Sequence, residues 1–455
     1  MSRRCHDSEW EQLDRVGARG RQLSLLREQL TRCAAVNPFY QRRWREAGLD
    51  VEKVTSLEEF ARRVPLSTKQ EFLADQSATP PYGDRLGVDP ADLVALNITS
   101  GTTGIGQEAY GLSASDLHVA GDSMAHCLTW SGLRPGDVLV TTTPITFLAA
   151  GLAVAEAARQ ARVVPIYGFG LDKKLLVDLI VRYRAAAIFA VPNLLIQLQQ
   201  AAVEAGYGPG DFASVRAIIS PMIMPPFSRV HEIEQFWGAR VYDVYGCTQS
   251  AGAVAASCEQ SVHDGTGRRN PTHFVGKHFF CEVIDETGQQ VGPGENGELV
   301  ITTLRRQASP VIRFAMRDRV TYLPHDACGC GRPFDGFLPG ETGRFDDMVK
   351  VKGINVWPPT VDNLIFGHPE IDEYRARVVL DERGREELLI TVAYKPDRAP
   401  AGAADEALSR AIAEEIKSTT LIRPRVSTVD RLDHFDFKPR RWTDDRAAGL
   451  QKITW

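Results

Sequence analysis

The chain has 455 residues, of which 43% are hydrophobic and 24% charged, so it can form two or three domains with a sizeable core. The formal net charge of −5 leaves no excess of basic residues, which excludes the electrostatic footprint of a nucleic-acid-binding protein. Eight cysteines in a chain of this length exclude the dense disulfide framework of a small secreted domain.

The N-terminal residues, "MSRRCHDSEWEQLDR", are charged and contain no apolar signal region, so we expect a cytoplasmic protein with mostly reduced cysteines. The longest apolar stretch, residues 147–161, is interrupted by Glu156 and is too short to cross a bilayer. We therefore expect neither a membrane nor a nucleic acid as a partner.

The N-terminal region up to residue 75 predicts helices, because Leu23, Leu26, Leu30 and Cys33 recur at helical spacing. From residue 90 onward, apolar segments typical of strands alternate with segments typical of helices. The predicted strands are residues 137–144, 161–168, 185–192, 215–220 and 239–246, and the predicted helices are residues 117–132, 173–185, 193–206 and 227–238. This alternation is typical of an α/β protein with parallel strands.

Residues 278–304 change to strands and turns, with the turn sequences "ETGQ" and "GPGENGE", and predict a β-rich subdomain. After "TGRFDD", strands at residues 373–382 and 386–395 are followed by a helix at residues 404–418. We therefore predict an α/β fold. Its parts are a large N-terminal domain (residues 1–345) with parallel sheets and a small, mobile C-terminal α+β domain (residues 346–455).

The stretch "NITSGTTGIGQEAY", residues 97–110, has the composition of a phosphate-binding loop. Backbone N–H groups and hydroxyls in such a loop can donate hydrogen bonds to anionic oxygens. It is not a Walker A loop, because no lysine lies between Lys69 and Lys173. Taken alone, the stretch could equally be an ordinary Ser/Thr-rich turn.

Four sequence motifs follow one another along the chain: "TSGTTG" (99–104), "YGCTQ" (245–249), "GELVITTL…PVIRFAMRD" (297–318) and "GRFDDMVKVKGINVWP" (343–358). Together they resemble the adenylate-forming superfamily of acyl-CoA ligases, adenylation domains and luciferases. Within it, the chain is similar to the phenylacetate–CoA ligase branch over nearly its whole length.

The resemblance implies that the Ser/Thr/Gly loop is a clamp over the β- and γ-phosphates of ATP, where Mg²⁺ compensates much of the charge. The phenylacetate branch commonly omits the lysine that many relatives have after this loop, and "GIGQ" agrees with that branch. The residues that the resemblance assigns to ATP or AMP are Ser100, Gly101, Thr102, Thr103, Gly104, Ser220, Pro221, Asp243, Tyr245, Gly246, Asp318 and Arg344.

Three of these residues have specific implied roles. Tyr245 would pack on the adenine, and its alternative is a core tyrosine at a strand end. Asp318 would accept hydrogen bonds from both ribose hydroxyls, because two carboxylate oxygens match two donors. Its alternative is a surface aspartate paired with Arg317 or Arg319. Arg344 would reach the ribose or phosphate region.

The C-terminal domain would supply the catalytic lysine. Lys438, in "DFKPRRWTDDR", aligns with the lysine that bridges the carboxylate and the α-phosphate during attack, and Arg441 aligns with the arginine that follows it. Phe437 stands where the family usually has glycine. A plain surface lysine at this position is the alternative, with Lys452 as the second candidate for the catalytic role.

The resemblance also implies a two-step use of this domain. After adenylation it would turn about a hinge at Asp346. The "KVKGIN" segment, with Lys352 and Gly353, would then face the site and bind coenzyme A.

Thr248 and Gln249 complete the predicted catalytic set with Lys438. Thr248 would contact the α-phosphate. Gln249 occupies the position of the family's glutamate in "YGxTE", which helps to hold Mg²⁺; glutamine keeps a carbonyl oxygen and loses the charge. We expect Gln249→Glu to lower the Mg²⁺ requirement, unless Gln249 donates a hydrogen bond to the acid substrate.

The predicted acid-binding residues are apolar or small. Phe147, with Ala149, Ala150 and Gly151, would line a slot for a flat ring, and Gly246 would border it. The stretch "ISPMIMPPF" lacks the Glu-Pro pair that the branch usually has after a strand, which makes the pocket wall apolar.

A structural zinc site is a further implication of the resemblance. Some enzymes of the branch have a cysteine, a downstream histidine and a later Cys-x-Cys pair, and such a set suits Zn²⁺. Here the corresponding residues are Cys258, His273, Cys328 and Cys330, with His263 as the alternative histidine.

The implied function is ATP-dependent activation of an aryl or arylacetic acid to an acyl-adenylate, followed by thioester formation with coenzyme A. The implied cofactors are ATP, Mg²⁺, coenzyme A and a structural Zn²⁺. Transfer to a carrier-protein phosphopantetheine or to an amine is one alternative, and a non-catalytic nucleotide-binding relative is another. A homodimer is one option for the oligomeric state.

Overall fold

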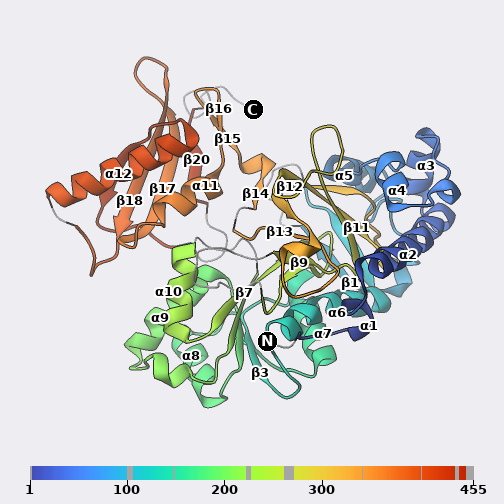
Figure 1. Cartoon of the computed structure of the whole chain (residues 1–455), viewed down its shortest axis with the longest axis horizontal. Helices are drawn as coiled ribbons and strands as arrows, with labels where there is room; N and C mark the ends of the chain where they lie inside the picture. The colour runs from blue at the N-terminus through green and yellow to red at the C-terminus, as the bar shows by residue number, and fades with distance from the viewer. Residues whose placement is uncertain are drawn as a thin grey trace. The chain divides into compact units, whose positions relative to one another are not determined.

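The computed structural model describes residues 3–99, 106–146, 149–221, 227–260, 271–340, 342–400, 402–435 and 440–446 (Figure 1). The chain divides into two compact units. The first comprises Met1–Val191, Leu198–Ile223 and Glu234–Pro339, and the second comprises Pro192–Gln197, Met224–Ile233 and Gly340–Trp455. The predicted boundary between residues 345 and 346 lies close to the start of this last segment and stays a prediction.

The N-terminal region is helical, as the spacing of its apolar residues predicts. The helices are α1 (Ser8–Glu11), α2 (Arg15–Val36), α3 (Pro38–Glu46), α4 (Leu57–Arg63) and α5 (Lys69–Ala78). Asp14 caps the start of α2 by accepting a hydrogen bond from the N–H of Gly17, and Asn37 caps α3, which begins with Pro38. Leu26 and Leu30 of α2 are fully buried against the strands of the same unit.

A hairpin precedes the main sheet. Strands β1 (Leu93–Ile98) and β2 (Ala109–Ser113) pair antiparallel. Beyond the last strand pair, the N–H of Thr99 donates to the carbonyl oxygen of Glu108 (3.0 Å), and the N–H of Glu108 donates to the hydroxyl of Thr99 (2.8 Å). These two bonds hold together the ends of the Ser/Thr/Gly loop.

One mixed sheet organises the first unit, with the strand order β10-β11-β12-β13-β9-β8-β7-β6-β5-β3-β4. The strands are β3 (Val138–Thr141), β4 (Val164–Tyr167), β5 (Ala187–Phe189), β6 (Ala217–Pro221), β7 (Arg240–Gly246), β8 (Ala253–Ser257), β9 (Thr272–Phe274), β10 (Phe279–Ile284), β11 (Asn296–Thr303), β12 (Phe314–Leu323) and β13 (Gly336–Phe337). Strands β3 to β7 pair in parallel, and the pairs from β7 onward are antiparallel.

This sheet confirms the predicted α/β class with parallel strands. The predicted β-rich subdomain does not form a sheet of its own, because β13 and β9 join its strands to the parallel part. A local strand-and-turn pattern predicts strands correctly but carries no information on which neighbour a strand will pair with.

Helices connect the parallel strands: α6 (Ala114–Trp130), α7 (Ala149–Ala161), α8 (Lys173–Arg182), α9 (Pro192–Glu204) and α10 (Phe227–Trp237). Helices α6 and α7 run side by side over the sheet (Figure 1). Trp130 of α6 and Ala157 of α7 meet Leu139 of β3 in one buried core. Helix α7 was not among the predicted helices: its stretch was considered only as an apolar run, although Ala153, Val154, Ala157 and Ala158 recur at helical spacing and are buried.

The C-terminal segment contains a short β14 (Gly343–Arg344) and the hairpin β15 (Val349–Val351) with β16 (Ile354–Val356). A second sheet has the order β19-β18-β17-β20, with β17 (Ile371–Leu380), β18 (Glu386–Tyr394), β19 (Arg425–Val429) and β20 (Trp442–Asp444). Helices α11 (Pro358–Ile365) and α12 (Ala403–Thr420) share a buried core with it. The predicted α+β character of this segment is confirmed.

Short 3₁₀ turns complete the chain: η1 (Val51–Lys53), η2 (Pro90–Asp92), η3 (Pro209–Phe212), η4 (His325–Ala327) and η5 (Phe345–Asp347). Within the described ranges, no helix is both long and apolar enough to cross a bilayer.

Candidate functional site

The candidate site lies where the parallel strands β6 and β7 end. Ser220 and Pro221 close β6, and they pair in register with Asp243 and Val244 of β7. Ligands of open α/β sheets bind at this carboxyl edge of the strands. The sheet thus brings two segments predicted to bind ATP next to each other.

Gly246 ends β7 at a place where no side chain fits. A Cβ atom there would lie 2.5 Å from the carbonyl oxygen of Gly252, because β7 turns back into β8 within a few residues. This glycine is therefore required by the tight approach of the two strands.

Tyr245 and Asp318 meet at this edge. The hydroxyl of Tyr245, at the end of β7, donates a hydrogen bond to Oδ2 of Asp318 on β12. The Tyr245 ring is half-buried and makes an edge contact with Phe337 at 5.5 Å. The residues predicted for the adenine and the ribose thus contact each other directly.

Two other predicted ATP residues are buried in the sheet. Asp243 is 5% exposed; its N–H donates to the hydroxyl of Ser257 (3.0 Å), and its carboxylate lies 3.5 Å from the hydroxyl of Thr272. Ser220 is 1% exposed, and among the described residues its hydroxyl oxygen has no hydrogen-bond partner. Asp243 is therefore tied to neighbouring strands.

The turn after β7 carries Thr248 and Gln249. The N–H of Cys247 donates to the hydroxyl of Ser250 (3.1 Å), and the N–H of Ala251 donates to the carbonyl oxygen of Thr248 (3.2 Å). Both Thr248 and Gln249 are half-buried in this turn.

Glu108 is a residue of this site that the sequence analysis did not identify. The amide Nε2 of Gln249 donates to Oε2 of Glu108 (3.0 Å), and the hydroxyl of Tyr110 donates to Oε1 (2.6 Å). Burial raises the pKa of Glu108, opposed by the Tyr110 hydroxyl and by the charges of Lys69 and Arg85. The available signal was a lone carboxylate directly after a loop of small residues, in a chain with glutamine at 249.

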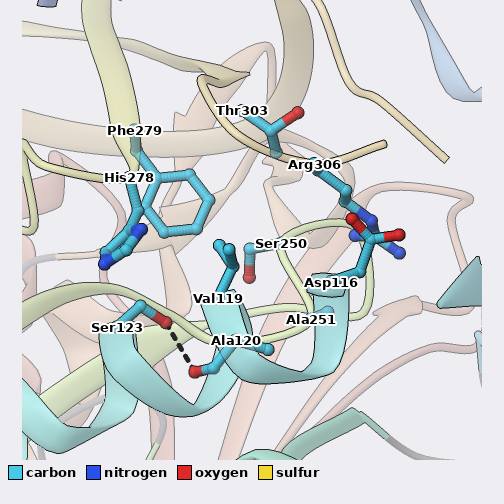
Figure 2. Close-up of a pocket in the computed structure, with 10 residues that line it drawn as sticks. All are labelled: Asp116, Val119, Ala120, Ser123, Ser250, Ala251, His278, Phe279, Thr303 and Arg306. Carbon is cyan, nitrogen blue, oxygen red and sulfur yellow. Dashed lines mark hydrogen bonds between the residues drawn. The ribbon is translucent and has the colours of Figure 1, made fainter. Parts of the chain in front are cut away.

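A small pocket lies behind the same turn (Figure 2). It is lined by Asp116, Val119, Ala120, Ser123, Ser250, Ala251, His278, Phe279, Thr303 and Arg306. None of the residues predicted to bind the acid line it, so we do not assign the acid to this pocket. Its walls show instead that helix α6 supports the turn from behind.

The structure describes only part of the segment predicted to bind the acid. Ala149, Ala150 and Gly151 form the first turn of α7, and Phe147 lies outside the described residues. A Cβ atom at Gly151 would lie 2.1 Å from the carbonyl oxygen of Pro144. The space beside Gly151 is therefore filled by the preceding loop.

Other predicted residues also fall outside the described part of the chain: Ser100, Gly101, Thr102, Thr103, Gly104, His263, Lys438 and Lys452. Arg344 is half-buried on β14, and Asp346 belongs to η5. Their roles stay predictions.

Arg441 has a structural partner within the second unit. Its guanidinium makes two hydrogen bonds to the buried carboxylate of Glu373, at 2.6 and 3.1 Å. The neighbouring carboxylates of Asp362 and Glu373 raise the pKa of Arg441, against the effect of its burial. These paired hydrogen bonds anchor the residue just before β20 to β17.

Lys352 and Gly353 form the two-residue tip of the β15–β16 hairpin. Their φ angles are +50° and +80°, as a type I′ turn requires, and the N–H of Lys352 donates to the carboxylate of Glu386. Both residues are exposed, so the hairpin presents them to solvent.

The four predicted zinc ligands gather in one buried cluster. Cys258 follows β8, His273 lies on β9, and Cys328 and Cys330 follow η4; all four are buried, and their ligand atoms lie within 4.8 Å of one another. Antiparallel pairing of Ala256 with His273 brings the first two together.

The spacing within this cluster matches a metal tetrahedron. The sulfurs of Cys258 and Cys328 are 3.7 Å apart, and the Cys330 sulfur is 3.4 Å from Nε2 of His273. A tetrahedron with ordinary Zn–S and Zn–N bond lengths requires about 3.8 Å and about 3.6 Å.

The surroundings of the cluster also suit a metal. Nδ1 of His273 lies 3.1 Å from the carbonyl oxygen of Phe334, which places the proton on Nδ1 and leaves Nε2 as a ligand. The N–H groups of Gln260 and Arg332 point at the sulfurs of Cys258 and Cys330, at 3.3 and 3.4 Å. These donors stabilise thiolates.

Comparison with known proteins gives two family matches. A model described as "AMP-binding enzyme" matches residues 27–304, and one described as "AMP-binding enzyme C-terminal domain" matches residues 353–446. A phenylacetate-coenzyme A ligase of Thermus thermophilus is 29% identical over 350 residues, which cover 76% of this chain and 74% of that protein.

Solved structures agree with these matches. A crystal structure of 2-hydroxyisobutyryl-CoA ligase in complex with R3-HIB-AMP has a TM-score of 0.86 and 25% identity, covering 98% of this chain and 95% of that one. Another structure of that ligase, in complex with 2-HIB-AMP and CoA, has a TM-score of 0.68 and 26% identity, covering 96% and 92%.

Proposed function

Because the chain belongs to the AMP-binding enzyme family, as an adenylate-forming acyl-CoA ligase, we propose that its substrate is an aryl or arylacetic acid. A carboxylate oxygen of the acid attacks the α-phosphorus of ATP, and pyrophosphate leaves. The thiolate of coenzyme A then attacks the acyl carbon, and AMP leaves.

The contact between Tyr245 and Asp318 is the observation that supports the adenylation step of this proposal. An aromatic ring near the end of β7 and a carboxylate within β12 offer a face for the adenine and acceptors for the ribose hydroxyls. The Tyr245 hydroxyl holds one carboxylate oxygen and so orients Asp318. The turn with Thr248 follows directly, within reach of the α-phosphate of a nucleotide bound there.

Three residues would act on the reacting groups. Thr248 would donate a hydrogen bond to the α-phosphate, and Lys438 would bridge the attacking carboxylate and the α-phosphate, stabilising the charge that develops. Gln249 would face the phosphates. Mg²⁺, when bound with ATP, supplies further charge compensation.

The aryl class rests on the likeness to the phenylacetate-coenzyme A ligase and on the apolar "ITFLAAGL" segment before and within α7. A short hydroxy acid is the second candidate, because 2-hydroxyisobutyryl-CoA ligase matches 98% of this chain in structure. Transfer to a carrier-protein phosphopantetheine or to an amine stays an alternative for the second step.

The Cys258, His273, Cys328 and Cys330 cluster would hold a structural Zn²⁺. Four protein ligands leave no open position for a substrate, which is typical of structural sites. The support is the near-tetrahedral spacing, the protonated Nδ1 of His273 and the N–H groups that face the sulfurs.

We further place the hinge at Asp346, between domains of residues 1–345 and 346–455, and coenzyme A at the Lys352–Gly353 hairpin tip. A cytoplasmic location is supported by the cysteines, none of the eight being in a disulfide bond, because a reducing compartment keeps cysteines reduced.

The test is a screen for acid-dependent pyrophosphate release, with and without coenzyme A. We expect phenylacetate or a related aryl acid to release pyrophosphate, and coenzyme A to give AMP and a thioester. Release with 2-hydroxyisobutyrate and with no aryl acid would overturn the aryl assignment in favour of the second candidate. Adenylation that proceeds to product only with a carrier protein or an amine would overturn the choice of acceptor.

A further inference from the structure

The hydrogen-bonded pair of Glu108 and Gln249 includes a carboxylate to which no role has yet been assigned. Resting on the proposed function, we propose that Glu108 supplies the negative charge for the Mg²⁺ that accompanies ATP, and that Gln249 presents its amide oxygen to the same ion. The charge would come from a carboxylate just before β2, and the oxygen ligand from an amide in the turn after β7.

The hydrogen bond between the two side chains determines how the amide is oriented. A carboxylate only accepts, so the Nε2 of Gln249 must face Oε2 of Glu108, 3.0 Å away. The amide oxygen Oε1 then points away from Glu108. Gln249 therefore keeps a hard oxygen donor of the kind that Mg²⁺ prefers, and Glu108 polarises this amide from behind.

Glu108 is also placed at the base of the loop predicted to hold the phosphates. Its backbone N–H and carbonyl oxygen both bond to Thr99, the last described residue before that loop. Its side chain is fully buried; Gln249 and Tyr110, which donate to it, are neutral, and the charges of Lys69 and Arg85 act on it as well. A carboxylate buried in this way gains from a further cation nearby, and the Mg²⁺ that accompanies ATP would be such a cation.

The contact between Glu108 and Gln249 changes the Mg²⁺ affinity expected for Gln249→Glu. The sequence suggests that a glutamate at 249 would improve Mg²⁺ binding. In the structure that substitution would put two carboxylates within the present 3.0 Å contact, and like charges at this distance repel. We therefore expect Gln249→Glu alone to lower the melting temperature and to bring no gain in metal affinity.

The experiment measures Mn²⁺ affinity by electron paramagnetic resonance, in the presence of a non-hydrolysable ATP analogue, together with the melting temperature. Glu108→Gln should weaken Mn²⁺ binding by about tenfold, the scale expected for losing one charge near an exposed ion. In the double variant Glu108→Gln/Gln249→Glu, the amide and the carboxylate exchange places. Mn²⁺ affinity should return to within about threefold of wild type, given that one decade is ~1.4 kcal/mol.

Tyr110→Phe is the matched control, because it removes the other hydrogen bond to Glu108 without changing any charge. It should leave Mn²⁺ affinity unchanged. A lower melting temperature with wild-type Mn²⁺ affinity in Glu108→Gln would overturn the inference and make Glu108 structural; a double variant no better than Glu108→Gln would also overturn it. Wild-type protein that binds no Mn²⁺–analogue complex would instead contradict the proposed function itself.

Discussion

Asp318 presents two acceptor oxygens, and one of them already receives the hydroxyl of Tyr245. The residue is half-buried on β12, so a ribose would bind to a carboxylate that the protein has already oriented. Because the carboxylate is already oriented, binding of the ribose would cost little side-chain entropy. Most of the hydrogen-bond energy would then appear in the affinity for ATP.

Asp318→Asn should therefore raise the KM for ATP by roughly 10- to 100-fold, since a hydrogen bond to a charged group contributes about 1.5–3 kcal/mol. The amide keeps one acceptor oxygen and replaces the other with a donor that faces the ribose hydroxyl unfavourably. Asp397→Asn, at an exposed position, is the control and should leave the KM unchanged. The measurement is steady-state kinetics with ATP as the varied substrate. An unchanged KM for ATP in both variants would contradict a role of Asp318 in ribose binding.

The cysteine cluster gives a second test at this scale. We expect purified protein to contain close to one equivalent of zinc, and Cys328→Ser to lower both zinc content and melting temperature, because binding of a structural metal adds to the free energy of folding. Elemental analysis and thermal denaturation measure the two quantities. The matched control is Cys127→Ser, since Cys127 is equally buried but lies in α6, away from the cluster. Equal zinc in both variants would refute the metal site.

At the scale of elements, the site depends on the packing of α6 against the turn between β7 and β8. A Cβ atom at Gly252 would lie 2.2 Å from the hydroxyl oxygen of Ser123 and 2.7 Å from the carbonyl oxygen of Ala120. The helix thus supports the turn that carries Thr248 and Gln249, and Figure 2 shows Ser123 and Ala120 lying beneath it.

Gly252→Ala should lower the free energy of unfolding by about 1–3 kcal/mol, the usual cost of overpacking a core, and should raise the KM for ATP as the turn shifts. Gly20→Ala is the control, because Gly20 lies in α2 with nothing within 4 Å of the added Cβ. That change should stabilise the protein by about 0.5–1 kcal/mol through helix propensity. Urea denaturation monitored by fluorescence would detect the opposite signs; equal stability of both variants would contradict the packing argument.

The elements themselves were largely predictable. Leu26 and Leu30 mark α2 by their spacing, and the apolar runs ending at Ser220 and Gly246 mark β6 and β7. Helix α7 was missed although Ala153, Val154, Ala157 and Ala158 form a buried face at helical spacing, because its stretch was considered only as an apolar run. The continuity of β10 to β13 with the parallel strands was also missed, because pairing partners are not local information.

At the scale of the molecule, the proposed reaction needs the C-terminal domain for two different steps. Lys438→Ala should reduce acyl-adenylate formation by several orders of magnitude, since losing one preorganised charge in a transition state costs about 3–5 kcal/mol. Thioester formation from a supplied acyl-adenylate should survive, because that step would use the Lys352–Gly353 hairpin.

Measuring each half-reaction separately tests this assignment, with Lys452→Ala as the matched control. Lys452→Ala should retain both half-reactions. Loss of adenylation in Lys452→Ala, with normal adenylation in Lys438→Ala, would move the catalytic role to Lys452. Equal loss of both half-reactions in Lys438→Ala would mean that Lys438 is structural.

The amino-acid sequence by itself determined the class of fold and the order of its motifs, because periodicity and motif spacing are local properties; the four residues of the Cys/His cluster came from the resemblance to a family. Only the tertiary structure decided which of these residues meet. Tyr245 contacts Asp318, Cys258 lies beside Cys328, and Gln249 donates to Glu108, with separations of 73, 70 and 141 residues along the chain. Such contacts follow from strand order and register, which depend on the whole sheet. Glu108 could therefore be recognised as part of the site only after the β1–β2 hairpin and the β7 turn were seen together.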